Sequence, residues 1–188
     1  MSRTVELFYD VVSTYSYLAS TQLAAISDRT GATFVWRPVL LGAVMKATGN
    51  APPASLPARA PYLMTDVQRW CRRYGVTFKL PARFPTNTLT AMRALTALEG
   101  DERVAASHRL FHAYFVDGAD VSDASVLTGL LGEGPVAMAS EPAIKAALRA
   151  TTEEAVARGA FGAPSFFLDG EMYFGNDRLH FLEEALQS

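Results

Sequence analysis

The sequence predicts an α/β protein whose sheet is interrupted by a long helical segment. Two short runs near the start, residues 4–9 and 33–38, are rich in β-branched and aromatic residues and flank a helical pattern. Two further apolar runs surround Asp169-Gly170 near the end, and a helix follows them. Between these parts the periodicity is helical. The expected order is therefore β-α-β, a helical block, a helix, and then β-β-α.

The first unit is predicted from its period and its stop signals. The run "TVELFY" at residues 4–9 and the run "TFVWRP" at residues 33–38 are expected strands. From Tyr15 to Thr30 apolar residues recur at helical spacing, and Gly31 is placed to end that helix. A strand, a helix and a strand within this length form a βαβ unit, so the two strands should be parallel.

The middle of the chain is expected to be helical. A proline-rich loop, "GNAPPASLPARAP", begins at Gly49. The stretches that follow with helical spacing are residues 62–74, 88–98, 101–116 and 123–131. Ser140 is the expected N-cap of a further helix that runs to about Arg158.

The end of the chain changes period again. The segment "SFFLDGEMYF" consists of two apolar runs around Asp169-Gly170, which predicts a hairpin with a two-residue turn. A last helix is expected from about Asp177.

Composition excludes several classes of function. The chain has 188 residues, of which 49% are hydrophobic and 19% charged, and its formal net charge is −2. This balance argues against nucleic-acid binding through bulk charge. The longest apolar run, from Val39, is too short to span a bilayer, and the first ten residues resemble neither a signal peptide nor an anchor. We therefore expect a cytoplasmic protein without nucleic-acid or membrane partners.

Cysteine content also limits the chemistry. Cys71 is the one cysteine, which excludes an internal disulfide and a Cys-x-x-Cys redox pair.

Hydroxyl side chains gather where the first strand passes into the first helix. In "YDVVSTYSYLA", residues 9–19, they are Ser13, Thr14, Tyr15 and Ser16. One interpretation is a helix N-cap, for which serine and threonine are preferred. The other is a site that stabilises an anion such as a thiolate, which a bound ligand would have to supply. No histidine neighbours these serines in the sequence, so a hydrolase is poorly supported.

The segment "FYDVVSTYSYLA" and the segment "GAFGAPSFFLDGEMYFGNDRL" at residues 159–179 together resemble the DsbA-like thioredoxin-fold group. The similarity is to the branch in which Ser-Pro-x-Ser replaces Cys-x-x-Cys. That branch contains kappa-class glutathione transferases and 2-hydroxychromene-2-carboxylate isomerases. The intervening "WRPVLLGAVMKATGN", "RWCRRYGVTFKLP" and "FPTNTLTAMRAL" are more similar to the isomerases.

This resemblance covers nearly the whole chain and implies a thioredoxin-like fold. Residues 1–39 and 156–188 would form the thioredoxin-like domain, and residues 40–155 would form an inserted all-helical domain. It also implies glutathione as cofactor and a homodimer.

The resemblance further implies a role for residues at both ends. Ser13 would face the glutathione sulfur, and Ser16 would be structural. Ala163 would pair its backbone with the cysteine part of glutathione, next to a cis peptide bond at Pro164. The family usually has proline where this chain has Thr14, which would compete with Ser13 as cap or as thiol partner.

Polar residues elsewhere match the two ends of the ligand. Asn176 and Asp177 would bind the γ-glutamyl end, although either would also serve as an N-cap. Asn50 matches the region that holds the glycyl end, although alone it is better explained as a turn residue. Lys46 and Arg59 are candidates for carboxylate contacts in the same neighbourhood.

A basic run supplies candidates for binding the substrate carboxylate. It contains Arg59, Arg69, Arg72, Arg73, Lys79 and Arg83 against the single acid Asp66. Such a run is usually a solvated helix face, but guanidinium groups also recognise carboxylates. Asn87 would orient substrate or cap the next helix. We take Lys46, Arg83 and Asn87 as the substrate-binding candidates.

Two other groups have simpler explanations. Trp70, Tyr74 and Phe78 would line an aromatic-substrate pocket, but core packing is the default for such residues. His108 and His112 lie four residues apart without an evident third ligand, so packing or a helix surface explains them better than a metal site. No metal is expected.

These residues and the resemblance together predict an enzyme. The expected activity is glutathione-dependent cis-trans isomerisation of 2-hydroxychromene-2-carboxylate to trans-o-hydroxybenzylidenepyruvate, in aromatic (naphthalene-type) catabolism. One alternative is a kappa-type glutathione transferase that conjugates small electrophiles. A second is a non-catalytic thioredoxin-fold binding module.

Overall fold

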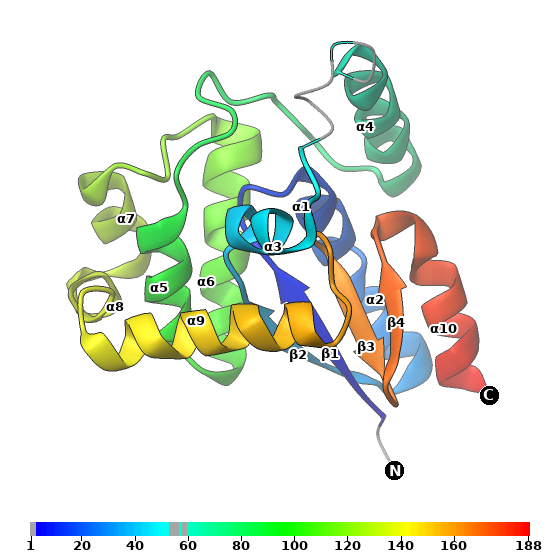
Figure 1. The fold of residues 1–188 in the computed structure, drawn as a ribbon. Helices are drawn as coiled ribbons and strands as arrows, with labels where there is room; N and C mark the ends of the chain where they lie inside the picture. Colours follow the sequence, from blue (N-terminus) through cyan, green and yellow to red (C-terminus); the bar gives the residue numbers. More distant parts are fainter. Residues whose placement is uncertain (1–2, 53–56, 58–59) are drawn as a thin grey trace.

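The computed structural model describes residues 3–52, 57 and 60–188 and contains a four-stranded mixed sheet (Figure 1). The strands are β1 (Thr4–Tyr9), β2 (Thr33–Pro38), β3 (Ser165–Leu168) and β4 (Glu171–Phe174), in the order β2-β1-β3-β4. Strands β1 and β2 are parallel, while β3 is antiparallel to both β1 and β4. The α/β class and the parallel first pair are confirmed.

The first helical segment is two helices and not the single helix expected from Tyr15 to Thr30. Helix α1 (Thr14–Ser20) ends before α2 (Leu23–Thr30) begins. The hydroxyls of Ser20 and Thr21 donate to the carbonyls of Tyr17 and Leu18, each at 2.7 Å. Such side-chain bonds to the backbone compete with helix continuation, which periodicity alone does not reveal.

The end of α2 and the turn of the β3–β4 hairpin are both determined by nearby residues. Gly31 caps α2 with φ 69°, as predicted. Asp169 and Gly170 have φ of 50° and 89°, which is the left-handed backbone that a two-residue hairpin turn requires.

The helical block matches the predicted stretches with shifted bounds. Its helices are α4 (Ala60–Tyr74), α5 (Leu89–Thr96), α6 (Gly100–His112) with a π-helical turn at Ala113–Asp117, and α7 (Ala124–Leu131). Two short helices were not predicted, α3 (Leu41–Thr48) and α8 (Glu133–Met138).

The prediction that Ser140 caps the next helix was wrong. Helix α9 (Pro142–Ala157) has Glu141 as its N-cap and Pro142 in its first turn. The Ser140 hydroxyl instead donates to the Ala137 carbonyl at 2.8 Å, in the turn that follows α8. Proline favours the first helical position, so Pro142 moves the helix start beyond Ser140.

The last helix also begins later than expected. A 3₁₀ turn at Asn176–Arg178 precedes α10 (Leu179–Gln187). Asn176 and Asp177 make no capping hydrogen bond through their side chains, so the prediction that one of them is the N-cap was wrong.

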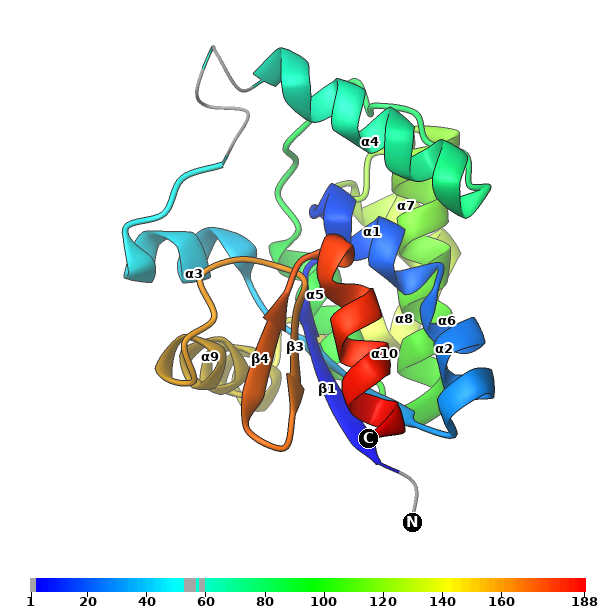
Figure 2. The ribbon, with the colours of Figure 1, turned by 90° about the vertical axis from the view of Figure 1, so that its right-hand side faces the viewer.

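Helices cover both faces of the sheet (Figure 2). Helices α2 and α10 lie on one side and α9 on the other, while α4 lies across the end of the sheet where α1 begins. Successive side chains of β1 point to opposite faces of the sheet. Leu7 and Tyr9 are therefore packed in the larger core, and Phe8 is packed with Phe167 in a smaller core.

The larger core is shared between the sheet and the helical block. The Tyr17 ring lies 6.0 Å from Phe111 and 5.3 Å from Phe115, measured between ring centroids. Residues from both ends of the chain and from its middle are therefore packed in one cluster. Within the described part of the chain, no helix is long and apolar enough to cross a membrane.

Candidate functional site

Ser13 is the N-cap of α1 and also faces the start of β3. Its Oγ accepts the N–H of Ser16 at 3.1 Å and donates to the carbonyl of Ala163 at 2.8 Å. The side chain is buried, with 6% of its residue surface exposed. Capping and a position in the candidate site thus use the same hydroxyl group.

The segment opposite Ser13 has the predicted cis bond. The Ala163–Pro164 peptide is cis. The Pro164 carbonyl accepts the N–H of Gly175 at 2.9 Å, and the Phe161 carbonyl accepts Nδ2 of Asn50 at 2.9 Å. Three distant segments, which carry Ser13, Asn50 and Asn176-Asp177, are therefore attached to residues 161–164.

Asn176 and Asp177 directly follow Gly175, whose N–H is bonded to the Pro164 carbonyl. Asn176 is buried, and its carbonyl accepts the hydroxyl of Tyr74 at 3.1 Å. The Asp177 carboxylate pairs with Arg178 and lies over Gly175, where an added Cβ would stand 2.5 Å from Asp177 Oδ1. Gly175 has φ 91°, a backbone conformation that favours glycine, and a Cβ there would also displace the Asp177 carboxylate.

Asn50 combines a turn with a long-range contact. It follows Gly49, which caps α3 with φ 69°, and its Oδ1 accepts the N–H of Ala51. Its amide group bonds Phe161, so it links the end of α3 to the cis-proline segment. Lys46 is exposed one turn earlier on α3. Arg59 lies outside the described residues.

Arg83 and Asn87 have other partners and are not bonded to the Ser13 cluster. Arg83 forms an ion pair with Asp120 at 3.0 Å, and 76% of its side chain is exposed. Asn87 Oδ1 accepts the N–H of Leu89 at 3.0 Å, so this side chain helps to begin α5. The N-cap of α5 is Thr88, so the alternative that Asn87 caps this helix was wrong, and the substrate roles of Arg83 and Asn87 stay predictions.

Helix α4 and the segment that follows it are hydrogen-bonded to α1, the helix that Ser13 caps. The Tyr15 hydroxyl donates to Asp66 Oδ2 at 2.8 Å, and the Tyr17 hydroxyl donates to the Thr77 carbonyl at 2.5 Å. Burial, assisted by the hydrogen bond to Asp66, raises the pKa of Tyr15, so this phenol stays protonated as a donor at neutral pH.

The basic run divides between several local contacts. Arg69 lies over the ring of Tyr62 and Arg73 over the ring of Trp70, each at 5.9 Å to the centroid. Exposed cation–π pairs of this kind are typical of a helix surface. The run therefore contributes mostly surface contacts in the described part of the chain.

The aromatic and histidine groups are explained by packing. The ring of Phe78 stacks on Phe115 at 5.4 Å, and that of Trp70 lies 5.2 Å from Tyr74. His108 packs against Trp36 at 5.1 Å, whereas His112 pairs with Asp117 at 3.1 Å. The two histidines thus contact different neighbours.

Two neighbours of Ser13 have different environments. Ser16 Oγ is buried and has no hydrogen-bond partner among the described residues. Thr14 is the buried first residue of α1 and is not the cap.

Asp10 is a buried carboxylate that sequence reasoning missed. Its exposed fraction is 1%, and Oδ1 accepts the N–H of Val12 at 3.0 Å and the hydroxyl of Thr88 at 2.8 Å. Oδ2 accepts the N–H of Leu41 at 2.9 Å, and the Asp10 carbonyl accepts the N–H of Ser13 at 3.0 Å. Asp10 therefore holds together the Ser13 turn, the start of α3 and the start of α5. The signal that could have revealed Asp10 in the sequence is an acidic residue directly after an apolar strand.

This fold and site define a class of protein. A strand-to-helix turn that faces a cis-proline before the third strand is the thioredoxin arrangement, and here serine occupies the turn. Residues 4–187 match the family model of the DSBA-like thioredoxin domain, and the chain belongs to that family.

Comparison with individual proteins finds two kinds of relative. The chain is 31% identical to 2-hydroxychromene-2-carboxylate isomerase of Sphingobium xenophagum, covering 99% of both chains. It is 33% identical to glutathione S-transferase kappa 1 of Homo sapiens, covering 99% of this chain and 92% of that protein. These relatives are enzymes by name, so an enzyme of isomerase or glutathione transferase type is supported.

Solved structures agree with this assignment. The structure of a 2-hydroxychromene-2-carboxylate isomerase superposes with a TM-score of 0.86 at 29% identity, over 97% of this chain and 94% of that one. A probable DsbA oxidoreductase of Streptomyces coelicolor, at 21% identity and TM-score 0.75, covers 98% of this chain and 88% of its own and shares the fold.

Proposed function

We propose that this protein is a glutathione-dependent isomerase that converts 2-hydroxychromene-2-carboxylate to trans-o-hydroxybenzylidenepyruvate in aromatic catabolism. The observation that carries the proposal is the buried hydroxyl of Ser13, 2.8 Å from the carbonyl of Ala163 beside the cis-proline. Similarity to isomerases along the full chain supports the reaction type. The proposal includes a homodimer in the cytoplasm, for which sedimentation and cell fractionation are the tests.

The chemistry of the residues around Ser13 fits glutathione. Within the described residues the N–H of Ala163 makes no hydrogen bond, so it is available to an extended peptide-like ligand. Asp177 stands on one side of residues 161–164 and would pair with an ammonium group. Asn50 stands on the other side, bonded to the Phe161 carbonyl, and would hold a carboxylate together with Arg59, which lies outside the described residues.

When bound, glutathione would supply the thiol nucleophile through which a conjugated double bond isomerises without net consumption of thiol. Ser13 would turn its hydroxyl proton from the Ala163 carbonyl towards the sulfur and donate a hydrogen bond to the thiolate. A donor in a buried site stabilises the charged form and lowers the thiol pKa. The bond from Ser16 N–H would keep the Ser13 side chain in place.

The substrate carboxylate requires a cation or amide donors near the proposed glutathione site. Lys46 is exposed on α3, which leads into the Asn50 loop, and no described residue pairs with it. We assign the first substrate contact to Lys46. For Arg83 to bind substrate it would have to leave Asp120, because the two form an ion pair.

Replacing Ser13 by alanine tests the mechanism. We expect kcat/KM for isomerisation to fall by about 100-fold, which is typical for loss of one donor to a developing anion. Ser16→Ala is the matched control, because its hydroxyl has no described partner and the same helix is altered. Equal rates for the two variants would remove Ser13 from the mechanism, provided that both melt as cooperative transitions.

A kappa-type glutathione transferase is the second candidate, favoured by the 33% identity to the human enzyme. The two activities differ in stoichiometry. An isomerase interconverts its substrate while free thiol stays constant, whereas a transferase consumes one thiol for each product. Glutathione binding measured by calorimetry, without turnover of either kind of substrate, would instead favour a non-catalytic binding module.

A further inference from the structure

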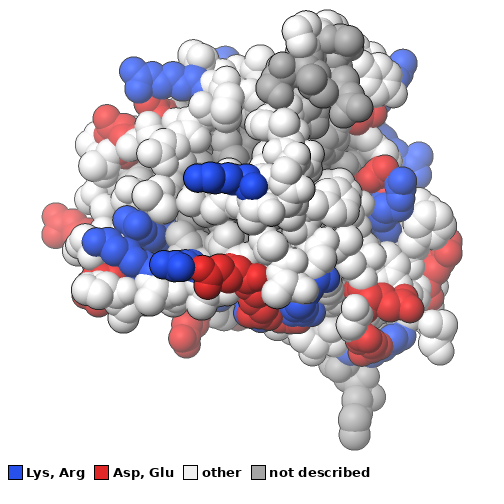
Figure 3. Space-filling view, viewed as in Figure 1, with Lys and Arg blue, Asp and Glu red and all other residues white. Residues whose placement is uncertain are grey.

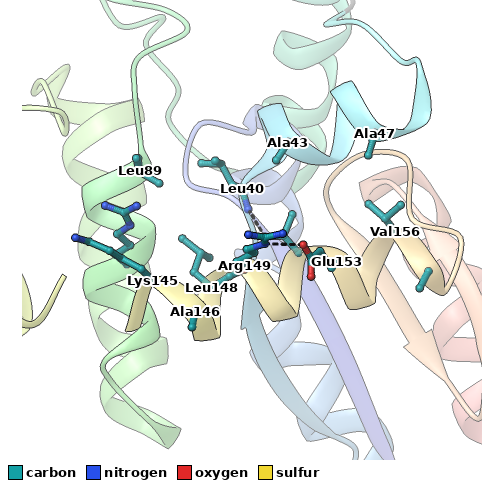
Figure 4. A pocket seen from close by; sticks show the side chains of 13 residues that line it. Leu40, Ala43, Ala47, Leu89, Lys145, Ala146, Leu148, Arg149, Glu153 and Val156 are labelled. Atoms are coloured by element: carbon teal, nitrogen blue, oxygen red, sulfur yellow. Dashed lines mark hydrogen bonds and ion pairs between the residues drawn. The ribbon is translucent and has the colours of Figure 1, made fainter. Parts of the chain in front are cut away.

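A second concave site lies apart from Ser13, between α3, α5 and α9 (Figure 4). Its volume is about 780 Å³, and none of the residues that we place in the glutathione site lines it. The Leu40 N–H donates to Thr152 Oγ1 at 3.1 Å, which joins α3 to the floor of this groove. The groove is thus formed by secondary structure that hydrogen bonds hold in place.

Small apolar side chains make most of its wall. Ala43 and Ala47 of α3 face Leu148 and Val156 of α9 across the groove. Alanine at these positions leaves space that larger side chains would fill. A groove of this size and polarity is of the kind that binds small apolar molecules.

Cations stand at one end of the groove. Arg93 on α5 and Lys145 on α9 line it, and neither forms an ion pair with any residue that the structure describes. Arg149 is the third cation, and it is paired with Glu153 at 2.7 Å. In Figure 3 blue side chains gather over α5 and α9 on this face, beside a strip of red.

The groove therefore has a charged end and an apolar end. In Figure 4 Lys145 and Leu89 lie at one end, while Ala47 and Val156 lie at the other. From this arrangement we propose that the groove binds a small monocarboxylate with an apolar body. The carboxylate pairs with Arg93 and Lys145, and the body lies along α9 towards Val156.

A second copy of the chain fits the groove less well than such an anion. In a two-fold interface this patch would meet the same patch of the other copy, and the one acid among its lining residues, Glu153, is already paired with Arg149. Like charges without partners oppose such contact, whereas a carboxylate neutralises them. The charge pattern thus selects a small anion as the occupant.

Titration with 2-naphthoate, followed by amide NMR of the full-length protein, tests the proposal. We expect shifts at Ala43, Ala47 and Val156, and binding that weakens as salt rises. The neutral analogue 2-naphthalenemethanol should bind about tenfold more weakly, as loss of a charged hydrogen-bonded pair implies. Shifts confined to Ser13 and Ala163 would overturn the proposal, and so would equal affinity for the neutral analogue.

Variants locate the binding further. The double variant Arg93→Gln/Lys145→Gln should weaken 2-naphthoate binding about tenfold, and Ala47→Phe, at an exposed position on the α3 wall of the groove, should block it. Arg109→Gln, an exposed arginine outside the groove, should leave it unchanged. If the double variant changes the sedimentation coefficient and not the affinity, the groove is an interface between copies and the proposal fails.

Discussion

The Asp10 carboxylate is bonded to two segments that are distant in sequence, at Leu41 and Thr88, as well as to its neighbour Val12, and the Asp10 carbonyl accepts the N–H of Ser13. Residues 10–13 are therefore shaped by a buried acid as well as by the helix that they begin. Two opposing effects act on the pKa of a carboxyl group in such surroundings. Burial raises the pKa of the Asp10 carboxyl, and the hydrogen bonds from Leu41, Val12 and Thr88 lower it, with burial dominant.

A pH dependence of stability follows from that balance. Because the folded-state pKa of Asp10 lies above its unfolded value, the folded chain binds the proton more tightly. Its contribution to the free energy of unfolding is fully present below the unfolded pKa, about 4, and is lost as pH rises through the folded pKa. We expect Asp10→Asn to remove this loss, so its stability should fall less than that of the wild type as pH rises above about 4.

Urea denaturation of both proteins at several pH values between about 4 and 8 measures this difference. Asp123→Asn is the control, because Asp123 is an exposed cap of α7 whose hydrogen bonds to Ser125 and Val126 lower its pKa. Parallel stability curves for wild type and Asp10→Asn would contradict the assignment of the titration to Asp10.

Helix α9 is attached to the sheet by a network of two arginines and two glutamates. Arg37 of β2 pairs with Glu6 of β1 and Glu154 of α9, and Arg158 pairs with the same two acids at 2.6 and 3.0 Å. The Arg158 guanidinium also lies 4.1 Å from the Phe167 ring centroid. Networks that are partly buried and stacked on aromatic rings stabilise more than isolated surface pairs.

Arg158→Met should therefore cost more than the same change at a surface pair. We expect Arg158→Met to lower the free energy of unfolding by about 1–2 kcal/mol, since it breaks two ion pairs and the cation–π contacts with Phe8 and Phe167. Arg149→Met, which breaks one exposed pair with Glu153, should cost no more than about 0.5 kcal/mol. Equal losses in denaturant titrations would show that the network adds nothing beyond surface pairing.

The whole molecule is predicted to unfold as one unit. The inserted domain at residues 40–155 stays a prediction, and one buried cluster joins Tyr9 and Tyr17 to Phe111 and Phe115 of the helical block. Aromatic side chains of both parts are packed in this cluster. A core shared in this way couples the two parts during unfolding.

The two tryptophans allow this coupling to be measured. Trp36 lies in β2 and Trp70 in α4, so the variants Trp36→Phe and Trp70→Phe each leave a single reporter. At one protein concentration, both fluorescence transitions should coincide with the loss of helical circular dichroism. Separate midpoints would mean that the helical block unfolds independently of the sheet.

Much of the fold was predictable because its signals are local. The Asp169-Gly170 turn, the Gly31 stop and the alternation of β1 depend on backbone preferences within a few residues. The errors in helix bounds arose where a hydroxyl side chain bonded a backbone group that the sequence pattern did not indicate. Ser20 and Thr21 ended a helix that periodicity would continue, and Ser140 bonded backwards instead of capping α9.

By itself the sequence determined the α/β class and the serine in the strand-to-helix turn, since these depend on residue type and short spacing, while the cis bond at Pro164 was expected from the family resemblance alone. Only the tertiary structure decided which groups meet: Ser13 with Ala163, Asn50 with Phe161, and Arg83 with Asp120. It also revealed Asp10 and the basic-ended groove under α3. The reason is physical, because a hydrogen bond or ion pair across 30 to 150 residues depends on how whole elements pack and leaves no periodic trace in the chain.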